Sequence, residues 1–410
     1  MINESNMHMK NKTFIIYVFL LFFNSFVNAQ IIGKHAKGDI NQDGNVNAAD
    51  IVDLVNIIFE GNGSGSNENE PTTSGSLELN ATISKLVGDQ SLSVDDFPEN
   101  IQYGNTISLY ATFNSFSGTI QIGKGTTRYG SAYLIIDNTT ITMISHYSDD
   151  VVRFSEKHNL DMSDHLSVTI SQNLDLFQIT IQTKSSNYSK IISNYEQFNG
   201  TPYIKTNGMD LSDVKLTASN AMLDSQLWAF GDSYFGMSSP NRVMYWLKQW
   251  GCVDFLIQGF AGQSSLYAYN DLEKLIKISR PRYIIWCLGM NDDNVSEKSN
   301  IEDTSWYKYY KKVSDVCEKN GIVLFLSTIP NVLNSKYKNK GIISDYVRST
   351  NYAYIDVAKA VGSNAQGQWY DYGTDSDYQY SDGVHPTEYG AKAIATQFLC
   401  DLSIFRLAKL

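Results

Sequence analysis

Three short segments of the sequence carry side chains that together could perform nucleophilic catalysis. Ser233 and Asn291 each follow an apolar run, and Asp382 and His385 come just before the last helix-like segment. A serine hydroxyl becomes a nucleophile when a histidine takes its proton and a carboxylate orients that histidine. An asparagine amide can stabilise the oxyanion that forms when the serine attacks a carbonyl carbon. The residue types therefore indicate acyl transfer.

Each segment alone has an ordinary interpretation. Gly231-Asp232-Ser233 and Asn291-Asp292 are also typical of turns. A single histidine is more often structural than catalytic. His385 is nevertheless the only histidine after His165, so a histidine base in the C-terminal half must be this residue. Asp382 precedes it closely enough to orient the imidazole from the same loop.

The C-terminal half alternates between strand-like and helix-like runs. This alternation predicts a parallel sheet with helices on both faces, and ligands gather at the carboxyl ends of such strands. Ser233 and Asn291 both come directly after predicted strands, so they should meet at one edge of the sheet. The predicted strands are Leu227–Phe230, Val253–Ile257, Tyr283–Leu288, Ile322–Ser327 and Tyr354–Ile355, and the predicted helices are Asn241–Trp250, Leu266–Ile278, Trp306–Lys319 and one from about Thr387.

These motifs, in this order, resemble the SGNH (GDSL-type) hydrolases over roughly residues 227–398, within a domain expected at 225–410. The resemblance implies a flavodoxin-like three-layer α/β fold and an acyl-enzyme mechanism without a metal or other cofactor. It implies that Ser233 is the nucleophile, Asp382 the acid and His385 the base.

The resemblance also implies an oxyanion hole with three donors. These are the amide of Ser233, the amide of Gly262 and the side chain of Asn291, while Gly259 is a competing candidate for the glycine. Tyr234 stands where many members have leucine, which should affect the acyl pocket more than the chemistry. No Gly-x-Ser-x-Gly motif surrounds the serine, and it lies near the start of its domain. Both observations argue against an α/β-hydrolase lipase.

An aromatic and polar segment at 368–380 precedes Asp382 and suits stacking on sugar rings near the site. The alternative is that these rings pack the loop. The candidate substrate-binding residues are Tyr234, Trp369, Tyr370 and Tyr380. We expect an acylated polysaccharide or oligosaccharide substrate, from which acetyl or other acyl groups are removed. The alternatives are a lipid-directed or general acyl-ester hydrolase, and a non-catalytic glycan-binding scaffold protein with a decayed hydrolase domain.

The N-terminal segment, residues 1–29, has the pattern of a signal peptide. Lys10 and Lys12 precede an apolar run at 14–23, and Val27-Asn28-Ala29 fits the small residues before a cleavage site. A membrane anchor is the alternative, but Asn24 and Asn28 interrupt a run that is already short. We expect a secreted or periplasmic protein with no integral membrane segment after cleavage.

Residues 31–61 contain a segment with the spacing of a calcium loop. Oxygen donors stand at loop positions 1, 3, 5, 9 and 12, and Gly44 stands at position 6, where the chain turns sharply. The segment resembles one type I dockerin repeat. Dockerins usually carry two, so it supports Ca²⁺ binding better than docking to a cohesin-like partner. The alternative is an Asn/Asp-rich loop without metal. The predicted ligands are Asp39, Asn41, Asp43 and Asp50, together with Asn45 through its backbone carbonyl.

A polar linker at 62–75 leads to a region, 76–218, of short alternating runs that predicts an antiparallel β-sandwich. The sandwich either binds carbohydrate or braces the catalytic domain. The predicted strands include Leu77–Ile83, Thr106–Phe113, Thr119–Ile122, Ala132–Ile136, Thr140–Ser145, Leu166–Ile170 and Leu176–Gln182.

The chain of 410 residues has a formal net charge of -11. An acidic chain without a basic stripe is a poor partner for nucleic acid. All four cysteines, Cys252, Cys287, Cys317 and Cys400, lie in the C-terminal half, and their spacing fits no metal motif. Buried free thiols are expected at Cys252 and Cys287, although export would permit a disulfide.

Overall fold

The computed structural model describes residues 76–101, 103–125, 130–146, 149–173, 176–193, 198–235, 239–251, 255–292, 298–337, 340–369, 378–379, 381–402 and 404. The predicted signal peptide, calcium loop and linker lie outside these residues. So do Cys252, Tyr370 and Tyr380. None of the helices in the described part is long and apolar enough to cross a membrane.

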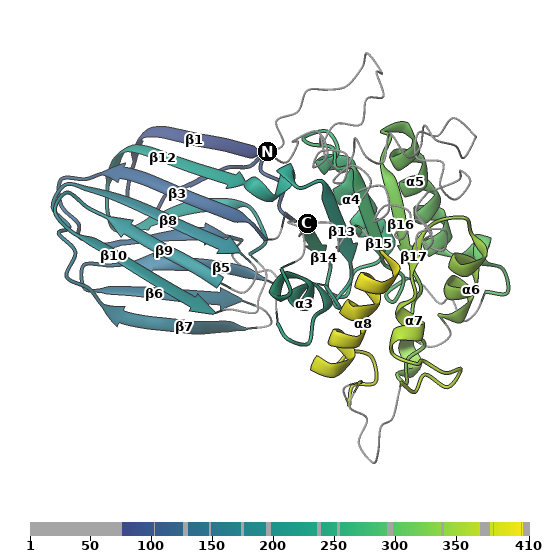
Figure 1. Cartoon of the computed structure of the whole chain (residues 1–410). Coiled ribbons are helices and arrows are strands. Elements are labelled where there is room, and N and C mark those ends of the chain that lie inside the picture. The colour runs from purple at the N-terminus through teal and green to yellow at the C-terminus, as the bar shows by residue number, and fades with distance from the viewer. Residues whose placement is uncertain are drawn as a thin grey trace, which may run out of the picture.

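The N-terminal part is a sandwich of two six-stranded antiparallel sheets (Figure 1). In spatial order, the first sheet contains β1 (Leu77–Leu86), β12 (Leu211–Asn220), β3 (Asn105–Thr112), β8 (His165–Asn173), β9 (Leu176–Gln182) and β10 (Asn187–Ser193). The second contains β2 (Ser91–Ser93), β11 (Pro202–Asn207), β4 (Thr119–Lys124), β5 (Ser131–Ile136), β6 (Thr140–His146) and β7 (Asp150–Lys157). The predicted antiparallel sheets are confirmed.

Alternating side chains build the core between the two sheets. In β8, Leu166, Val168 and Ile170 are fully buried, while the residues between them are partly exposed. This period of two is what a strand with one face on a core requires. The edge strands β7 and β10 carry adjacent apolar residues, Val151-Val152 and Ile191-Ile192, instead of an apolar–polar alternation, and none of their side chains is fully buried. Both strands were absent from the sequence-based prediction for that reason.

The C-terminal part has a five-stranded parallel sheet in the order β14-β13-β15-β16-β17. This order is the doubly wound, flavodoxin-like arrangement, and it places the first strand in sequence next to the centre of the sheet. The expected parallel sheet is confirmed. Its strands are β13 (Leu227–Gly231), β14 (Phe255–Gly259), β15 (Tyr283–Cys287), β16 (Val323–Ser327) and β17 (Tyr354–Ile355).

Helices pack in two groups around this sheet (Figure 1). One group is α3 (Val243–Gln249), α7 (Val357–Ala360) and α8 (Glu388–Asp401), in which α8 contacts the other two. In the other, α4 (Ser265–Leu275) contacts α5 (Ser305–Lys319), and α6 (Gly341–Ser349) contacts β16. Helices α6 and α7 were not predicted. Helix α7 is a segment of only four residues, whereas α6 is amphipathic, with Ile343 and Val347 buried on one face.

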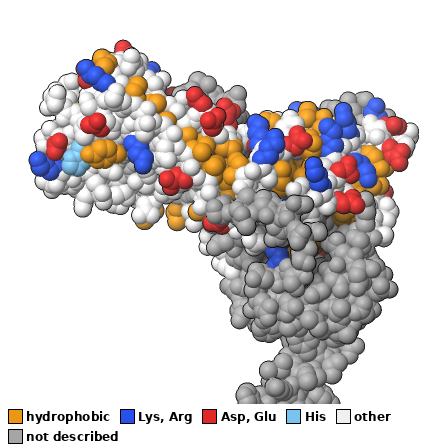
Figure 2. Space-filling view, turned by 90° about the horizontal axis from the view of Figure 1, so that it is seen from above, with side chains coloured by type: hydrophobic (Ala, Val, Ile, Leu, Met, Phe, Trp, Pro, Cys, Tyr) orange, Lys and Arg blue, Asp and Glu red, His pale blue; other side chains and the backbone are white. Residues whose placement is uncertain are grey.

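The two parts share one buried apolar cluster. A 3-10 helix (Ala221–Asp224) joins β12 directly to β13. The cluster includes Ile101 and Leu223 on the sandwich side and Leu227 and Phe255 on the α/β side. On the face shown in Figure 2, positive and negative side chains are interspersed over both parts. The molecule therefore has a continuous interior and a mixed-charge surface on this face.

Two of the cysteines, Cys287 and Cys317, are buried free thiols, as expected for Cys287. Burial raises the pKa of both thiols well above the usual range. A buried thiol held in its protonated form is a weak nucleophile. Cys400 is exposed. The two buried cysteines therefore act as small apolar side chains.

Candidate active site

Ser233 lies in a tight turn at the carboxyl end of β13. The backbone amide of Phe235 donates to the Asp232 carbonyl at 3.0 Å, and the amide of Tyr234 donates to the Asp232 carboxylate at 3.1 Å. Gly231 is needed because a Cβ atom there would lie 2.2 Å from the ring of Phe235. The turn therefore depends on close packing at Gly231, rather than on an unusual backbone angle.

His385 forms hydrogen bonds with both Ser233 and Asp382. The imidazole Nε2 lies 2.8 Å from the Ser233 Oγ, and the Nδ1 lies 2.6 Å from the Asp382 Oδ2. This series of contacts is the arrangement in which a histidine takes a proton from a serine while a carboxylate stabilises the imidazolium. The His385 side chain is 30% exposed, so the site is open to a substrate.

Asp382 also organises the backbone of the loop that carries His385. Its Oδ1 accepts hydrogen bonds from the amides of Val384, at 2.8 Å, and His385, at 3.0 Å. Partial burial raises the pKa of Asp382, but the hydrogen bonds from the amide and ring of His385 outweigh burial, and the net pKa is lowered. The carboxylate is therefore ionised, as an orienting residue must be.

Helix α8 anchors this loop from its other end. Thr387 is the N-cap, and its side chain accepts a hydrogen bond from the amide of Gly390 at 3.2 Å. Gln379 pairs with Pro386 in a short antiparallel bridge, and its side chain donates to the Gly383 carbonyl at 3.0 Å. Such local bonds hold the loop, and with it His385, in one conformation.

The three proposed oxyanion donors follow three neighbouring strands. β13 lies between β14 and β15, and Gly231 is in register with both Gly259 and Cys287. Ser233, Gly262 and Asn291 come two to four residues after these positions. They therefore lie at the same edge of the sheet.

Gly262 lies in a turn after β14. The amide of Gln263 donates to the Phe260 carbonyl at 2.9 Å, and Gly262 has a φ of 71°, which favours glycine. The competing candidate, Gly259, is the last residue of β14 itself. The Asn291 Nδ2 donates to the Gln263 carbonyl at 3.1 Å. The structure thus brings Asn291 against the turn that contains Gly262.

A buried carboxylate that the sequence analysis did not single out fixes Asn291. Asp292 accepts hydrogen bonds from the amide of Ser265 at 3.1 Å and from the hydroxyls of Ser265 and Ser305 at 2.8 and 3.2 Å. The Lys340 Nζ donates to the backbone carbonyl of Asp292 at 2.9 Å. Burial raises the pKa of Asp292, although the bonds from Ser265 counter it. In the sequence, the only indication of this role was that Asp292 directly follows Asn291 at the end of a predicted strand.

Tyr234 and Trp369 pack the site instead of facing solvent. The Tyr234 hydroxyl donates to the Val384 carbonyl at 2.8 Å, and its ring packs edge-on against both His385 and Trp369 at 6.2 Å. Trp369 is only 3% exposed, and its Nε1 donates to the Asn331 carbonyl at 2.8 Å. The prediction that Trp369 stacks on sugar rings is therefore corrected: the alternative, that the ring packs the loop, applies to it.

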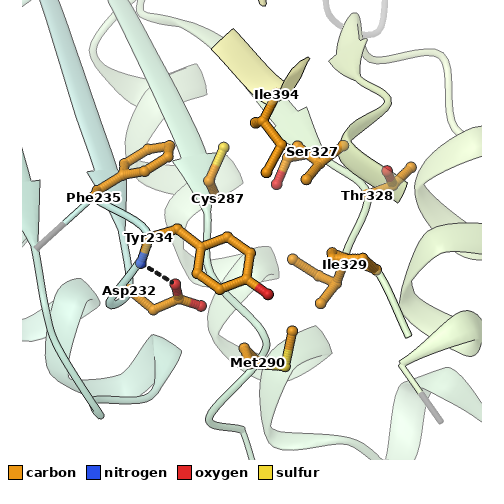
Figure 3. Close-up of a pocket in the computed structure, with 11 residues that line it drawn as sticks. Asp232, Tyr234, Phe235, Cys287, Met290, Ser327, Thr328, Ile329 and Ile394 are labelled. Carbon is orange, nitrogen blue, oxygen red and sulfur yellow. Dashed lines mark hydrogen bonds between the residues drawn. The ribbon is translucent and has the colours of Figure 1, made fainter. Parts of the chain in front are cut away.

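A small cavity lies behind the turn that carries Ser233 (Figure 3). The carboxylate of Asp232 and the ring of Tyr234 face it, across from Ile329. Ser233, Gly262 and Asn291 are not among its lining residues. Burial raises the pKa of Asp232 to about 6, although the Tyr234 amide and the charge of His385 favour its ionised form. The cavity belongs to the interior that supports the turn, so it is distinct from an acyl pocket.

Comparisons with known proteins give a partial match. Residues 258–401 match a family described as a protein of unknown function (DUF459). None of the curated proteins matches the chain. A solved structure, that of a putative lipolytic protein of the G-D-S-L family from Desulfitobacterium hafniense, is similar at 18% identity, covering 43% of this chain and 98% of that one with a TM-score of 0.35.

Two further solved structures represent different kinds of protein. A GDSL-like lipase from Bacteroides thetaiotaomicron is 15% identical and covers 44% of this chain and 87% of its own, with a TM-score of 0.34. The galectin LEC-6 from Caenorhabditis elegans is 8% identical and covers 33% of this chain and 95% of its own, with a TM-score of 0.26.

Proposed function

We propose that this protein is a serine esterase of the SGNH type. The observation that carries the proposal is the continuous series of contacts from the Ser233 Oγ through His385 to the Asp382 carboxylate, at 2.8 and 2.6 Å. Each atom has the role that nucleophilic acyl transfer needs, and each side chain is oriented by further hydrogen bonds.

In the proposed reaction, His385 takes the proton of Ser233 as its Oγ attacks the ester carbonyl. The imidazolium, stabilised by Asp382, then gives the proton to the alcohol as the C–O bond breaks. This leaves an acyl-enzyme on Ser233. Water, activated by the same histidine, attacks the acyl carbon and releases the acid. The proton returns to Ser233, so the residues are restored.

The oxyanion would be bound by the amides of Ser233 and Gly262 and by the Asn291 side chain. A primary amide carries two N–H groups. One N–H of Asn291 donates to the Gln263 carbonyl, and this bond supports an orientation in which the second meets the oxyanion. Removal of one such donor raises the barrier by about 3 kcal/mol.

For the substrate, we propose an acylated glycan from which small acyl groups, foremost acetyl, are removed. The open site, with His385 30% exposed, supports access for an ester carried on a bulky alcohol. The cavity behind Ser233 is lined by neither the nucleophile nor the oxyanion donors, so this cavity is not placed to receive the acyl chain. A lipid ester is the competing substrate, and a decayed, non-catalytic domain is the competing class.

Hydrolysis of aryl acetates by wild type and Ser233→Ala tests the esterase. We expect the variant to fall to the background rate, a loss of at least about 10⁴-fold. Ser349→Ala is the matched control, because this serine is exposed at the end of α6 and bonds only locally to the Tyr346 carbonyl. Survival of hydrolysis at the wild-type rate in Ser233→Ala would exclude Ser233 as the nucleophile.

The substrate class is tested by the acid released. Wild type is incubated with acetylated xylan, acetylated pectin and a phospholipid or triglyceride dispersion, and the free acids are quantified. Acetate release that depends on Ser233 supports the glycan. Faster release of long-chain acids would favour the lipid alternative, and no release from any ester would favour a non-catalytic role.

A further inference from the structure

One sandwich residue, Asn100, contacts several side chains of the α/β part. Its backbone carbonyl accepts a hydrogen bond from the Gln258 Nε2 at 3.0 Å, across 158 positions of sequence. Its side-chain Oδ1 accepts one from the Tyr267 hydroxyl at 2.6 Å. A further side-chain bond from Asn100 favours the ionised form of Asp271. Asn100 therefore joins β14, which carries Gln258, to α4, which carries the other two.

These contacts lie in a buried polar cluster. Gln258 is fully buried and Asp271 is 2% exposed, and the Gln258 Nε2 donates to the Asp271 carboxylate at 2.6 Å. On the sandwich side, the fully buried Lys124 donates to the Ile101 carbonyl at 3.1 Å, and its charge acts on Asp271. Buried polar groups that satisfy one another fix a single geometry, because each broken bond leaves a desolvated group.

A short path leads from this cluster to the proposed oxyanion hole. The ring of Tyr267 packs edge-on against Phe260 at 5.3 Å. Phe260 is the first residue of the turn that contains Gly262, and its carbonyl accepts the hydrogen bond from the Gln263 amide that closes the turn. The Phe260 amide donates to the Gly231 carbonyl at 2.8 Å. Asn100 is therefore linked, through Tyr267 and Phe260, to the turn of the proposed oxyanion glycine and to the end of the nucleophile strand.

We propose that Asn100 is a positioning residue for the oxyanion-binding turn at 260–263, and that the sandwich thereby braces the catalytic centre. This inference rests on the proposed esterase function. Gln258 precedes the turn and Tyr267 follows it, so Asn100 fixes both flanks of the segment. A donor displaced by even a fraction of an ångström stabilises the oxyanion less, and the loss appears in the transition state.

Asn100→Ala tests the proposal in the full chain: it removes the side-chain bonds to Tyr267 and Asp271 and keeps the backbone carbonyl that accepts from Gln258. We expect kcat for an aryl acetate to fall by about tenfold or more, with KM within roughly twofold, because an interaction stronger in the transition state is lost. Asn80→Ala is the matched control. Asn80 is an exposed residue of β1 whose side chain bonds to Thr217 of the neighbouring strand. The kcat of the Asn80→Ala variant should equal that of the wild type.

Tyr267→Phe provides a second, milder variant that keeps the ring against Phe260 and removes only the hydroxyl that reaches Asn100. We expect the same direction of change. In the double variant with Asn100→Ala, the increase in the activation barrier should be smaller than the sum of the two single increases, since both substitutions break the same hydrogen bond. Circular dichroism and thermal unfolding of each variant, with assays run well below every midpoint, separate misfolding from mispositioning.

An arylboronic acid reports on the oxyanion site directly. Its boron accepts the Ser233 Oγ and becomes a tetrahedral anion that resembles the intermediate. Its inhibition constant should rise in Asn100→Ala in proportion to the loss of kcat/KM, and should stay unchanged in Asn80→Ala. A folded Asn100→Ala with wild-type kcat and boronate affinity would overturn the proposal. If wild type itself showed no Ser233-dependent hydrolysis, the esterase function would fail instead, so the two failures are distinguishable.

Discussion

The imidazole Nε2 of His385 lies 2.8 Å from the hydroxyl oxygen of Ser233, although 152 positions of sequence separate the two residues. The nucleophile turn follows the first strand of the α/β part, and His385 precedes its last helix. β13 lies between β14 and β15, next to the centre of the sheet. The loop before α8 therefore reaches the carboxyl end of β13, where Ser233 lies.

Replacing the orienting carboxylate should reduce turnover while leaving the loop folded. In Asp382→Asn, the amide oxygen can still accept the two backbone bonds, but the ring of His385 loses its anionic partner. We expect kcat to fall by about 10³- to 10⁴-fold. Steady-state kinetics on an aryl acetate measures this, with Asp345→Asn, an exposed carboxylate on α6, as the control. A loss below about threefold would remove Asp382 from the proposed mechanism.

Loss of the Asn291 side chain should raise the barrier without weakening substrate binding. We expect Asn291→Ala to lower kcat by about 10²- to 10³-fold at nearly constant KM. Asn300→Ala is a matched control, because Asn300 is an exposed cap of a 3-10 helix outside the site. If KM rose and kcat held, Asn291 would be a ground-state substrate contact instead of an oxyanion donor.

Ionisation of Asp232 should make the protein less stable as pH rises. Burial raises its folded pKa from 3.8 to about 6, so between these values the folded state binds more protons than the unfolded state. The contribution of Asp232 to stability is therefore fully present below about pH 4 and is lost as pH rises through 6, at a cost of about 3 kcal/mol.

Urea unfolding at pH 4.5 and pH 7 checks this prediction. The free energy of unfolding should differ less between the two pH values in Asp232→Asn than in wild type. The variant keeps an oxygen for the Tyr234 amide. Asp271 is also buried with a pKa of about 6 and contributes its own share in every variant. Asp224→Asn, at an exposed position, is the control. An unchanged pH dependence in Asp232→Asn would contradict the assigned ionisation.

Calcium binding by the N-terminal segment remains a prediction, since residues 39–50 lie outside those described. We expect calorimetry on the chain without residues 1–29 to detect Ca²⁺ binding at millimolar or lower concentrations. Asp43→Ala should abolish the heat, because it removes a charged ligand at the fifth loop position. If the wild-type chain showed no Ca²⁺-binding isotherm, the segment would instead be an Asn/Asp-rich loop without metal.

The positions of the site residues could be anticipated because they depend on chain order. Strand–helix alternation predicted that Ser233 and Asn291 follow parallel strands, and the scarcity of histidines singled out His385. The local bond between Asp382 and His385 spans only three residues. Short-range patterns and topology were sufficient for these features.

Other features depend on long-range packing that no local pattern contains. The burial of Trp369 results from its contacts with Tyr234 and with the Asn331 carbonyl, which are distant in sequence. Asn100 meets Gln258 and Tyr267 only because two differently built parts dock there. Strand β10 lies at a sheet edge and carries Ile191 and Ile192 side by side, one on each face, so it lacks the apolar–polar alternation by which strands are detected.

The apolar cluster that runs unbroken through the junction has a thermodynamic consequence. Parts that share one interior cannot open independently, since separating them would expose apolar surface and the buried Gln258–Asp271 pair to water. Heating should therefore melt the sandwich and the α/β part in a single calorimetric transition. The α/β part expressed alone would expose the apolar surface that the sandwich covers in the full chain. We expect it to aggregate instead of remaining active.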